Sequence, residues 1–173
     1  DAPPVIIDES DADLASLPRA LDLGYAGTSH KNCKGIVKGI ANACLLENRR
    51  REAPGRHLIL SGEDLGNIGP VALLQDLTVM SLLGVEHVER NGHHYFRGAS
   101  MFPEAMQRAL LEDHADLYRR HEHGFPTLDI RGGRLDIGSL LEAPFGLAPL
   151  LDLSPFPRLD DWVTEGMPLG ESS

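Results

Sequence analysis

The sequence is poor in several features, and each deficit excludes a class of protein. Its 173 residues include only two cysteines, Cys33 and Cys44. Two cysteines cannot form a disulfide framework, and they lack the CxxC spacing of common zinc and redox sites. No apolar run approaches the ~18 residues of a membrane-spanning helix, and we identify no signal peptide. We therefore expect a protein of the reducing cytoplasm.

Basic residues are also scarce: 16 Lys and Arg stand against 26 Asp and Glu, for a formal net charge of −10. A general nucleic-acid or anionic-membrane surface needs a basic patch, so we expect neither as a partner. The hydrophobic content of 42% is typical of a globular chain rather than a disordered one. The length allows one domain with a real core, or two at most.

The first 94 residues show a repeated pattern of a strand followed by a helix. Short segments at 4–7, 27–31, 57–60 and 85–88 are predicted to be strands, and helical spacing of apolar residues predicts helices near 14–21, 36–51 and 67–83. The run at 4–7 is continuous and apolar, as in a strand buried on both faces. In the second helix the predicted buried stripe is Ile36, Val37, Ile40, Ala43 and Cys44. This α/β order is typical of βα units that build a parallel sheet.

The remainder of the chain has a different pattern. A helix is expected from Ser100 to about His121, and alternation around Gly132-Gly133 predicts a hairpin over 128–137 with a two-residue turn. From Ala143 the chain is rich in Pro and Gly, so we expect an extended tail with Trp162 as a possible anchor. Because a strand follows almost at once after Asp1, we expect that the chain begins inside a larger protein.

Each predicted strand ends in a polar cluster. The clusters are Asp8-Glu9, Lys31-Asn32, Glu63-Asp64 and His93-His94. The carboxyl ends of parallel strands meet at one edge, and in a (β/α)8 barrel that edge is the active face. We therefore expect these side chains to share one site.

Two of these motifs resemble the enolase superfamily, of the mandelate racemase/muconate lactonizing enzyme kind. Pro4-Val-Ile-Ile-Asp-Glu-Ser10 is similar to the fifth barrel strand, and Thr28-Ser-His-Lys-Asn-Cys-Lys-Gly35 to the sixth. The resemblance, from Val5 to about Asn91, implies a partial (β/α)8 TIM-type barrel of about strands 5 to 8. Residues 1–98 would form half a barrel. Residues 99–173 would form a helix, a hairpin and a tail that pack on the barrel or its missing cap domain.

The resemblance also implies a chemistry: abstraction of a proton α to a carboxylate, with Mg²⁺ stabilising the enediolate. Asp8 would be a metal ligand, Glu9 a supporting residue, and Lys31 a catalytic base whose pKa is lowered by burial near a cation. Glu63 and His93 are the other catalytic candidates. The substrate-binding candidates are Lys34, Asp64 and His94.

Each assignment has a structural alternative. Asp8, Glu63 and Asp64 are suited to cap the helices that follow them, Lys31 to be a solvated loop residue, and Lys34 to begin a helix. Adjacent residues of an extended chain face opposite ways, so at most one of His93 and His94 is expected to line a pocket. His30 and His57 are expected to be structural. For His114, His121 and His123, expected in a polar helix, the spacing does not indicate a metal site.

Departures from the family motif keep other functions open. Only one glycine follows Lys34, no histidine base ends the seventh strand, and two metal ligands are missing. We expect a lyase or isomerase, meaning a dehydratase, racemase or cycloisomerase, that acts on a small carboxylate. It would need the rest of the barrel and the capping domain as partners and would form a homo-oligomer. The alternatives are a non-catalytic half-barrel scaffold and a flavodoxin-like binding domain, which an open five-stranded sheet would favour.

Overall fold

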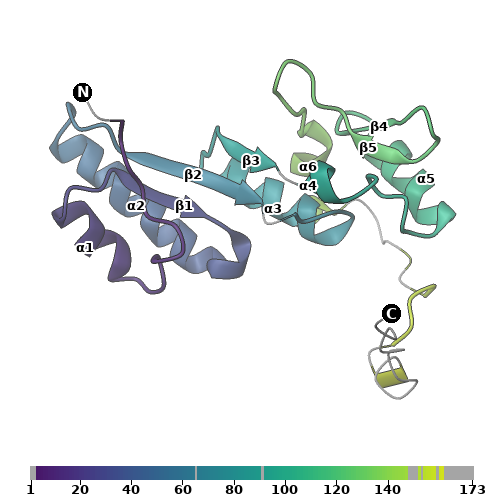
Figure 1. Cartoon of the computed structure of the whole chain (residues 1–173), viewed down its shortest axis with the longest axis horizontal. Helices are drawn as coiled ribbons and strands as arrows, with labels where there is room; N and C mark the ends of the chain where they lie inside the picture. Colours follow the sequence, from purple (N-terminus) through teal and green to yellow (C-terminus); the bar gives the residue numbers. More distant parts are fainter. Residues whose placement is uncertain are drawn as a thin grey trace, which may run out of the picture.

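The computed structural model describes residues 3–64, 66–90, 92–147, 152, 154–158 and 160–161 (Figure 1). The side chains of Asp64, His93 and His94 lie outside this description. So does Trp162, the expected anchor, with the rest of the tail from that residue onward.

The N-terminal part of the chain alternates between helices and strands, as the sequence predicts. Its elements are α1 (Ser16–Asp22), β1 (Gly27–His30), the 3₁₀ turn η1 (Asn32–Lys34), α2 (Ile36–Glu52), β2 (Ile59–Asp64), α3 (Val71–Leu82), β3 (Val88–Arg90) and α4 (Gly92–Tyr95). β2 continues to Asp64 rather than ending at residue 60, so Glu63 and Asp64 belong to the strand.

The three strands form a parallel sheet in the order β1-β2-β3. The register places Ser29 beside Ser61 and Gly62 beside Val88. The segment before α1 runs parallel to β1 but joins it through a single bridge, between Ile7 and Thr28. The prediction of a strand at 4–7 buried on both faces is therefore wrong, because Val5 is 60% exposed.

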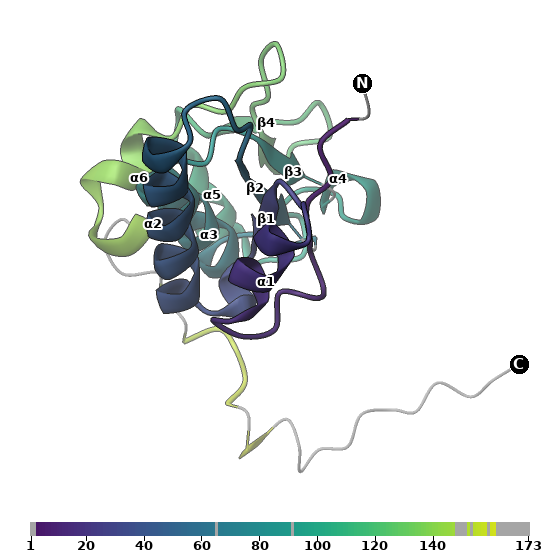
Figure 2. The same cartoon turned by 90° about the vertical axis from the view of Figure 1, so that its left-hand side faces the viewer.

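Helices α2 and α3 cover the same face of this sheet. A Cβ on Gly39 of α2 would lie 2.4 Å from the His30 ring, and a Cβ on Gly62 would lie 2.6 Å from the sulfur of Met80 in α3. His30 and Gly62 are register partners, so their Cα substituents point to the same side. Both helices therefore cross over on one side of the sheet. Figure 2, viewed along the strands, shows α1 and α2 beside β1 and β2.

The predicted buried stripe of α2 is wrong. Val37 is 80% exposed and Ile40 42% exposed, whereas the buried residues of this helix are Gly39, Asn42 and Leu46. The helix turns a mixed face toward the sheet because His30 occupies the space above Gly39 and Asn42 bonds to buried Asp11. An apolar stripe is thus left on the outer surface of the described chain.

The C-terminal part differs from the sequence prediction in its element types. It contains α5 (Glu104–Asp113), β4 (Tyr118–Arg120), β5 (Pro126–Leu128), α6 (Gly138–Glu142) and the 3₁₀ turn η2 (Pro144–Gly146). β4 and β5 form an antiparallel pair, so the helix predicted to reach His121 ends earlier, at Asp113.

The predicted hairpin over 128–137 is reduced to one bridge, Arg131 to Arg134. The two glycines between them do form the expected tight turn, with φ values of +56° and +75° that favour glycine. Leu128 belongs instead to β5, opposite Tyr118.

Two apolar clusters stabilise the fold. One joins α1, α2 and the residue before β2 through Leu17, Leu21, Leu46 and Leu58. The larger joins α3 to the C-terminal elements, and its buried members are Leu73, Leu74, Leu77, Ala99, Leu110, Leu117, Tyr118 and Leu140. The protein is a mixed α/β fold with a small parallel sheet and a two-stranded antiparallel sheet. In the part of the chain described, every helix is too short or too polar to cross a membrane.

Candidate functional site

Lys31 follows the last residue of β1, at the carboxyl edge of the parallel sheet. The next three residues form η1, whose backbone closes with Lys34 N–H donating to the Lys31 carbonyl at 3.0 Å. Side chains three residues apart lie nearly above one another in a 3₁₀ turn. This turn therefore brings the ammonium groups of Lys31 and Lys34 to the same place, beside Asp8.

The Lys31 ammonium group lies among three carboxylates. Its Nζ is 3.0 Å from Asp8 Oδ2, 2.7 Å from Glu9 Oε1 and 3.0 Å from Glu63 Oε2. The Lys31 side chain is only 3% exposed, whereas Asp8 and Glu63 are 35% and 22% exposed and Glu9 is 81% exposed. A buried cation is thus surrounded by carboxylates that extend toward solvent.

The parallel register explains why these residues meet. Ser29 faces Ser61 across β1 and β2, so two residues further on Lys31 faces Glu63. The Ile7–Thr28 bridge places Asp8 beside Ser29, whose hydroxyl donates to Asp8 Oδ1. Alternation along the strands puts Ser29, Lys31 and Glu63 on the face opposite that covered by α2 and α3.

Lys34 completes the cluster from the other side. Its ammonium group donates to the Asp8 carboxylate, to the Asp8 carbonyl at 2.8 Å and to the Ser29 hydroxyl at 3.1 Å. Its side chain is 10% exposed. Asp8 therefore accepts from two ammonium groups and one hydroxyl, which is more than a helix cap would require.

The pKa values in this cluster move in different directions. Burial works to raise the pKa of Asp8, but hydrogen bonds from Lys34, Ser29 and Lys31 outweigh it and hold that pKa well below its ordinary value. Burial raises the pKa of Glu63, and the neighbouring Asp8 carboxylate adds to this effect against the opposing influence of Lys31. Of these two carboxyl groups, Glu63 is the one shifted toward neutral pH.

Among the described residues, the pKa of Lys31 moves in the direction opposite to the one expected for a base beside a bound cation. Burial works to lower it, but hydrogen bonds to Glu9, Asp8 and Glu63 outweigh burial and raise the pKa above its ordinary value. Lys31 is therefore an ammonium ion at neutral pH and not a free base. The sequence did not assign Glu9 a direct contact with Lys31, and its place directly after Asp8 is the signal that could have indicated one.

The other predicted site residues fall where side chains are not described. Asp64 lies in β2 beside Arg90 of β3, and His93 and His94 lie in α4. The prediction of an extended chain at His93 and His94 is wrong, because β3 ends at Arg90 and a helical turn begins at Gly92. Their side chains lie outside the described residues, and so does any contact between Asp64 and the cluster.

The cluster does not by itself provide a donor set for Mg²⁺. This ion binds several oxygen ligands at ~2.1 Å, whereas the oxygens of Asp8 here accept from Ser29, Lys31 and Lys34. Asp8, Glu9 and Glu63 are not grouped closely enough for one ion to bind all three. Magnesium therefore stays a prediction from the resemblance.

A different group of potential metal ligands lies in the turn between β4 and β5. Ligand atoms of His121, Glu122 and His123 lie within 4.8 Å of one another, although the spacing of these histidines in the sequence does not indicate a metal site. They lie in a turn rather than a helix. His121 is stacked on Phe125 with ring centroids 4.5 Å apart, and its Nδ1 accepts from the His123 N–H at 3.2 Å.

Comparison with known proteins adds no further assignment. Neither a family model, nor a curated protein, nor a solved structure matches this chain significantly. The relationship to the enolase superfamily therefore remains a prediction carried by the motifs around Asp8 and Lys31.

Proposed function

We propose that the Lys31 cluster is an acid–base site and that the chain is part of an enolase-superfamily enzyme acting on a small carboxylate. The observation that carries the proposal is the buried Lys31 ammonium group, hydrogen-bonded at a strand end to Asp8, Glu9 and Glu63. Active sites concentrate such shifted, mutually interacting groups. The resemblance supplies the reaction class, and the geometry supplies the pair of groups that would move the proton.

In this proposal Glu63 and Lys31 have complementary roles. The Glu63 carboxylate accepts the proton α to the substrate carboxylate, and the electrons of the broken C–H bond move onto the carboxylate oxygens as an enediolate. The Lys31 ammonium group stabilises that negative charge, which a buried cation does more effectively than an exposed one. Delivery of a proton to the opposite face of the enediolate gives racemisation, and protonation of a β-hydroxyl group with its loss as water gives dehydration. His93, in the short helix α4 that follows β3, is the proposed second acid–base group.

The fold supports a partial barrel over the flavodoxin-like alternative. Strand order follows chain order, and α2 and α3 both cover one face, as they do outside a (β/α)8 barrel. A doubly wound sheet would place helices on both faces. The rest of the barrel and the capping domain are the proposed partners, and the exposed Val37 and Ile40 on α2 are suited to such a contact. Those partners would also have to provide the further carboxylates that Mg²⁺ needs.

The test is exchange of α-protons in D₂O, because it needs no knowledge of the final product. The 173-residue chain is incubated with Mg²⁺ and a panel of 2-hydroxy and 2-amino carboxylates, and loss of the α-proton signal is followed by NMR. We expect exchange on at least one acid, reduced about 100-fold or more in Glu63→Gln. Glu47→Gln, at an exposed ion pair, is the matched control and should exchange at the wild-type rate.

A structural role for the cluster is the second candidate, favoured by a specific observation. All three N–H donors of Lys31 already have carboxylate partners, so the cluster also ties the segment before α1 to β1 and β2. Under this alternative the chain is a non-catalytic half-barrel scaffold. Exchange that Glu63→Gln leaves unchanged, in samples shown to be folded by circular dichroism, would reject the acid–base proposal and support the scaffold. Absence of exchange on every acid would show that the cluster does not move protons without the proposed partners.

A further inference from the structure

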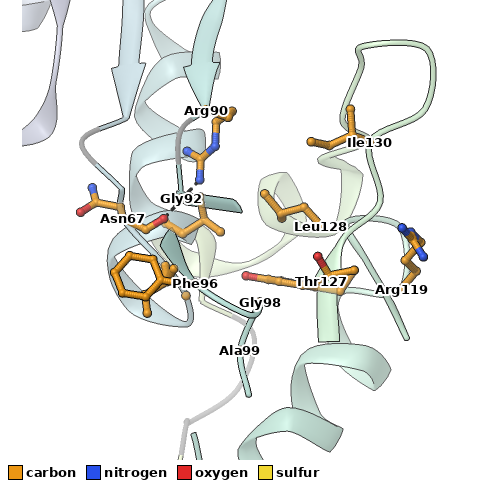
Figure 3. Close-up of a pocket in the computed structure, with 14 residues that line it drawn as sticks. Asn67, Arg90, Gly92, Phe96, Gly98, Ala99, Arg119, Thr127, Leu128 and Ile130 are labelled. Carbon is orange, nitrogen blue, oxygen red and sulfur yellow. Dashed lines mark hydrogen bonds between the residues drawn. The ribbon is translucent and has the colours of Figure 1, made fainter. Parts of the chain in front are cut away.

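A cavity of about 230 Å³ lies beyond the ends of β2 and β3, where the C-terminal elements pack against them. Figure 3 shows Asn67, Arg90 and Phe96 on one side of it and Thr127, Leu128 and Ile130 on the other. Gly62 of β2 pairs with Val88 of β3, and Arg90 lies two residues further along β3, so Gly62 and Arg90 face the same side of the sheet. Met80 of α3 covers that side at Gly62. The cavity wall at Arg90 therefore belongs to the helix-covered face of the sheet, opposite the face that carries Lys31 and Glu63.

The Tyr118 hydroxyl group, in the cavity wall, has no hydrogen-bond partner among the described residues. Tyr118 is 5% exposed, and its hydroxyl makes no hydrogen bond with any described residue. The hydroxyl lies against Gly69, where a Cβ would come within 2.6 Å of it. Burial raises the pKa of this phenol, so it is a neutral donor at physiological pH. Buried hydroxyl groups nearly always have a partner, and a ligand in the cavity would provide one.

Among the described residues, both cationic and apolar side chains line the cavity. Arg90 donates to the Asn67 carbonyl at 3.4 Å and is near enough to Tyr118 to influence its pKa. Leu73, Phe96 and Leu128 supply apolar surface. Since a water molecule takes up about 30 Å³ of liquid, the space is suited to a ligand of about eight non-hydrogen atoms.

We propose that this cavity binds a small carboxylate with an apolar body. The Tyr118 hydroxyl would donate to the carboxylate, the Arg90 guanidinium would balance its charge, and the apolar body would contact Leu73, Phe96 and Leu128. The site does not depend on the acid–base proposal, because it uses none of the residues of the Lys31 cluster.

The test uses benzoate as the probe and the 173-residue chain as the protein. Titration at pH 7.5, followed by calorimetry or by backbone amide shifts, should give saturable binding with a Kd below ~1 mM. Tyr118→Phe should weaken benzoate binding about tenfold, since a hydrogen bond to a charged group is lost. Arg90→Met should weaken it at least as much. Tyr25→Phe, at a partly exposed tyrosine outside the cavity, should bind as the wild type does.

A second measurement separates loss of a contact from loss of folding. Without ligand, Tyr118→Phe should melt at the wild-type temperature or above it, because the change removes a buried hydroxyl that has no partner. Absence of saturable benzoate binding to the folded wild-type chain would overturn the proposal. So would equal binding by Tyr118→Phe, or equal binding of benzyl alcohol, which has the same body without the charge.

Discussion

Replacement of Lys31 by Met should destabilise the protein in a way that depends on pH. Methionine fills a similar volume, so the change chiefly removes the charge. Removing one partner of a fully buried ion pair costs about 3–5 kcal/mol, whereas an exposed pair contributes less than about 1 kcal/mol. Glu9 is 81% exposed, so its pair with Lys31 counts as an exposed pair, and Asp8 keeps its ion pair with Lys34 in the variant. Glu63, at 22% exposure, loses its only cationic partner among the described residues.

These contributions give an expected loss of about 2–3 kcal/mol at pH 8. The sign of the pH dependence follows from Glu63. Its pKa is already raised in the folded protein and should rise further without Lys31, so the folded variant binds a proton more readily than the unfolded chain. That stabilisation is present below the ordinary glutamate pKa of about 4.5 and is lost as the pH rises through the raised value. The loss of stability of Lys31→Met relative to the wild type should therefore be smaller at pH 5 than at pH 8.

The assay is urea denaturation followed by circular dichroism at both pH values, with EDTA present to remove metal ions. Arg51→Met is the matched control, because Arg51 is 77% exposed in its pair with Glu47 and should change the stability by less than about 0.5 kcal/mol. The double variant Lys31→Met/Glu63→Gln should recover part of the loss at pH 8. A Lys31→Met deficit no larger than that of the control, or one independent of pH, would refute the reasoning.

Three further predictions concern the sheet and the outer surface of α2. Gly39→Ala should lower the free energy of unfolding by about 1–3 kcal/mol despite the higher helix propensity of alanine, because its Cβ would meet the buried His30 ring. Thermal melts would test this, with Gly55→Ala, at an open position, as the control. Equal melting temperatures of the two variants would contradict the packing. Burial lowers the pKa of His30, so its imidazole should titrate below 6.5 in an NMR pH series, and stability should fall as the pH drops from the ordinary value through the lowered one. The exposed Val37 and Ile40 should promote association, so we expect oligomers in sedimentation runs and fewer of them in Val37→Glu/Ile40→Glu; a wild-type chain that sediments as a well-folded monomer would count against this.

The sequence determined the βα order and the convergence of Asp8, Lys31, Lys34 and Glu63. Alternating strand and helix patterns predict a parallel sheet, and in such a sheet the strand ends share one edge. No property of distant residues is needed for that inference. The glycine turn at 132–133 was also a local feature.

Tertiary structure decided what local patterns do not specify. The side of α2 that is buried depends on the fit of Gly39 against His30, a contact across elements. Leu128 pairs with Tyr118 and not within the predicted hairpin over 128–137, and local sequence patterns do not distinguish these two pairings. The protonation of Lys31 depends on the distances to three carboxylates from two other segments, because ionic energies vary with separation and burial. The sequence therefore determined that Asp8, Lys31, Lys34 and Glu63 meet, and only the packed structure decided their charge state and the cavity around Tyr118.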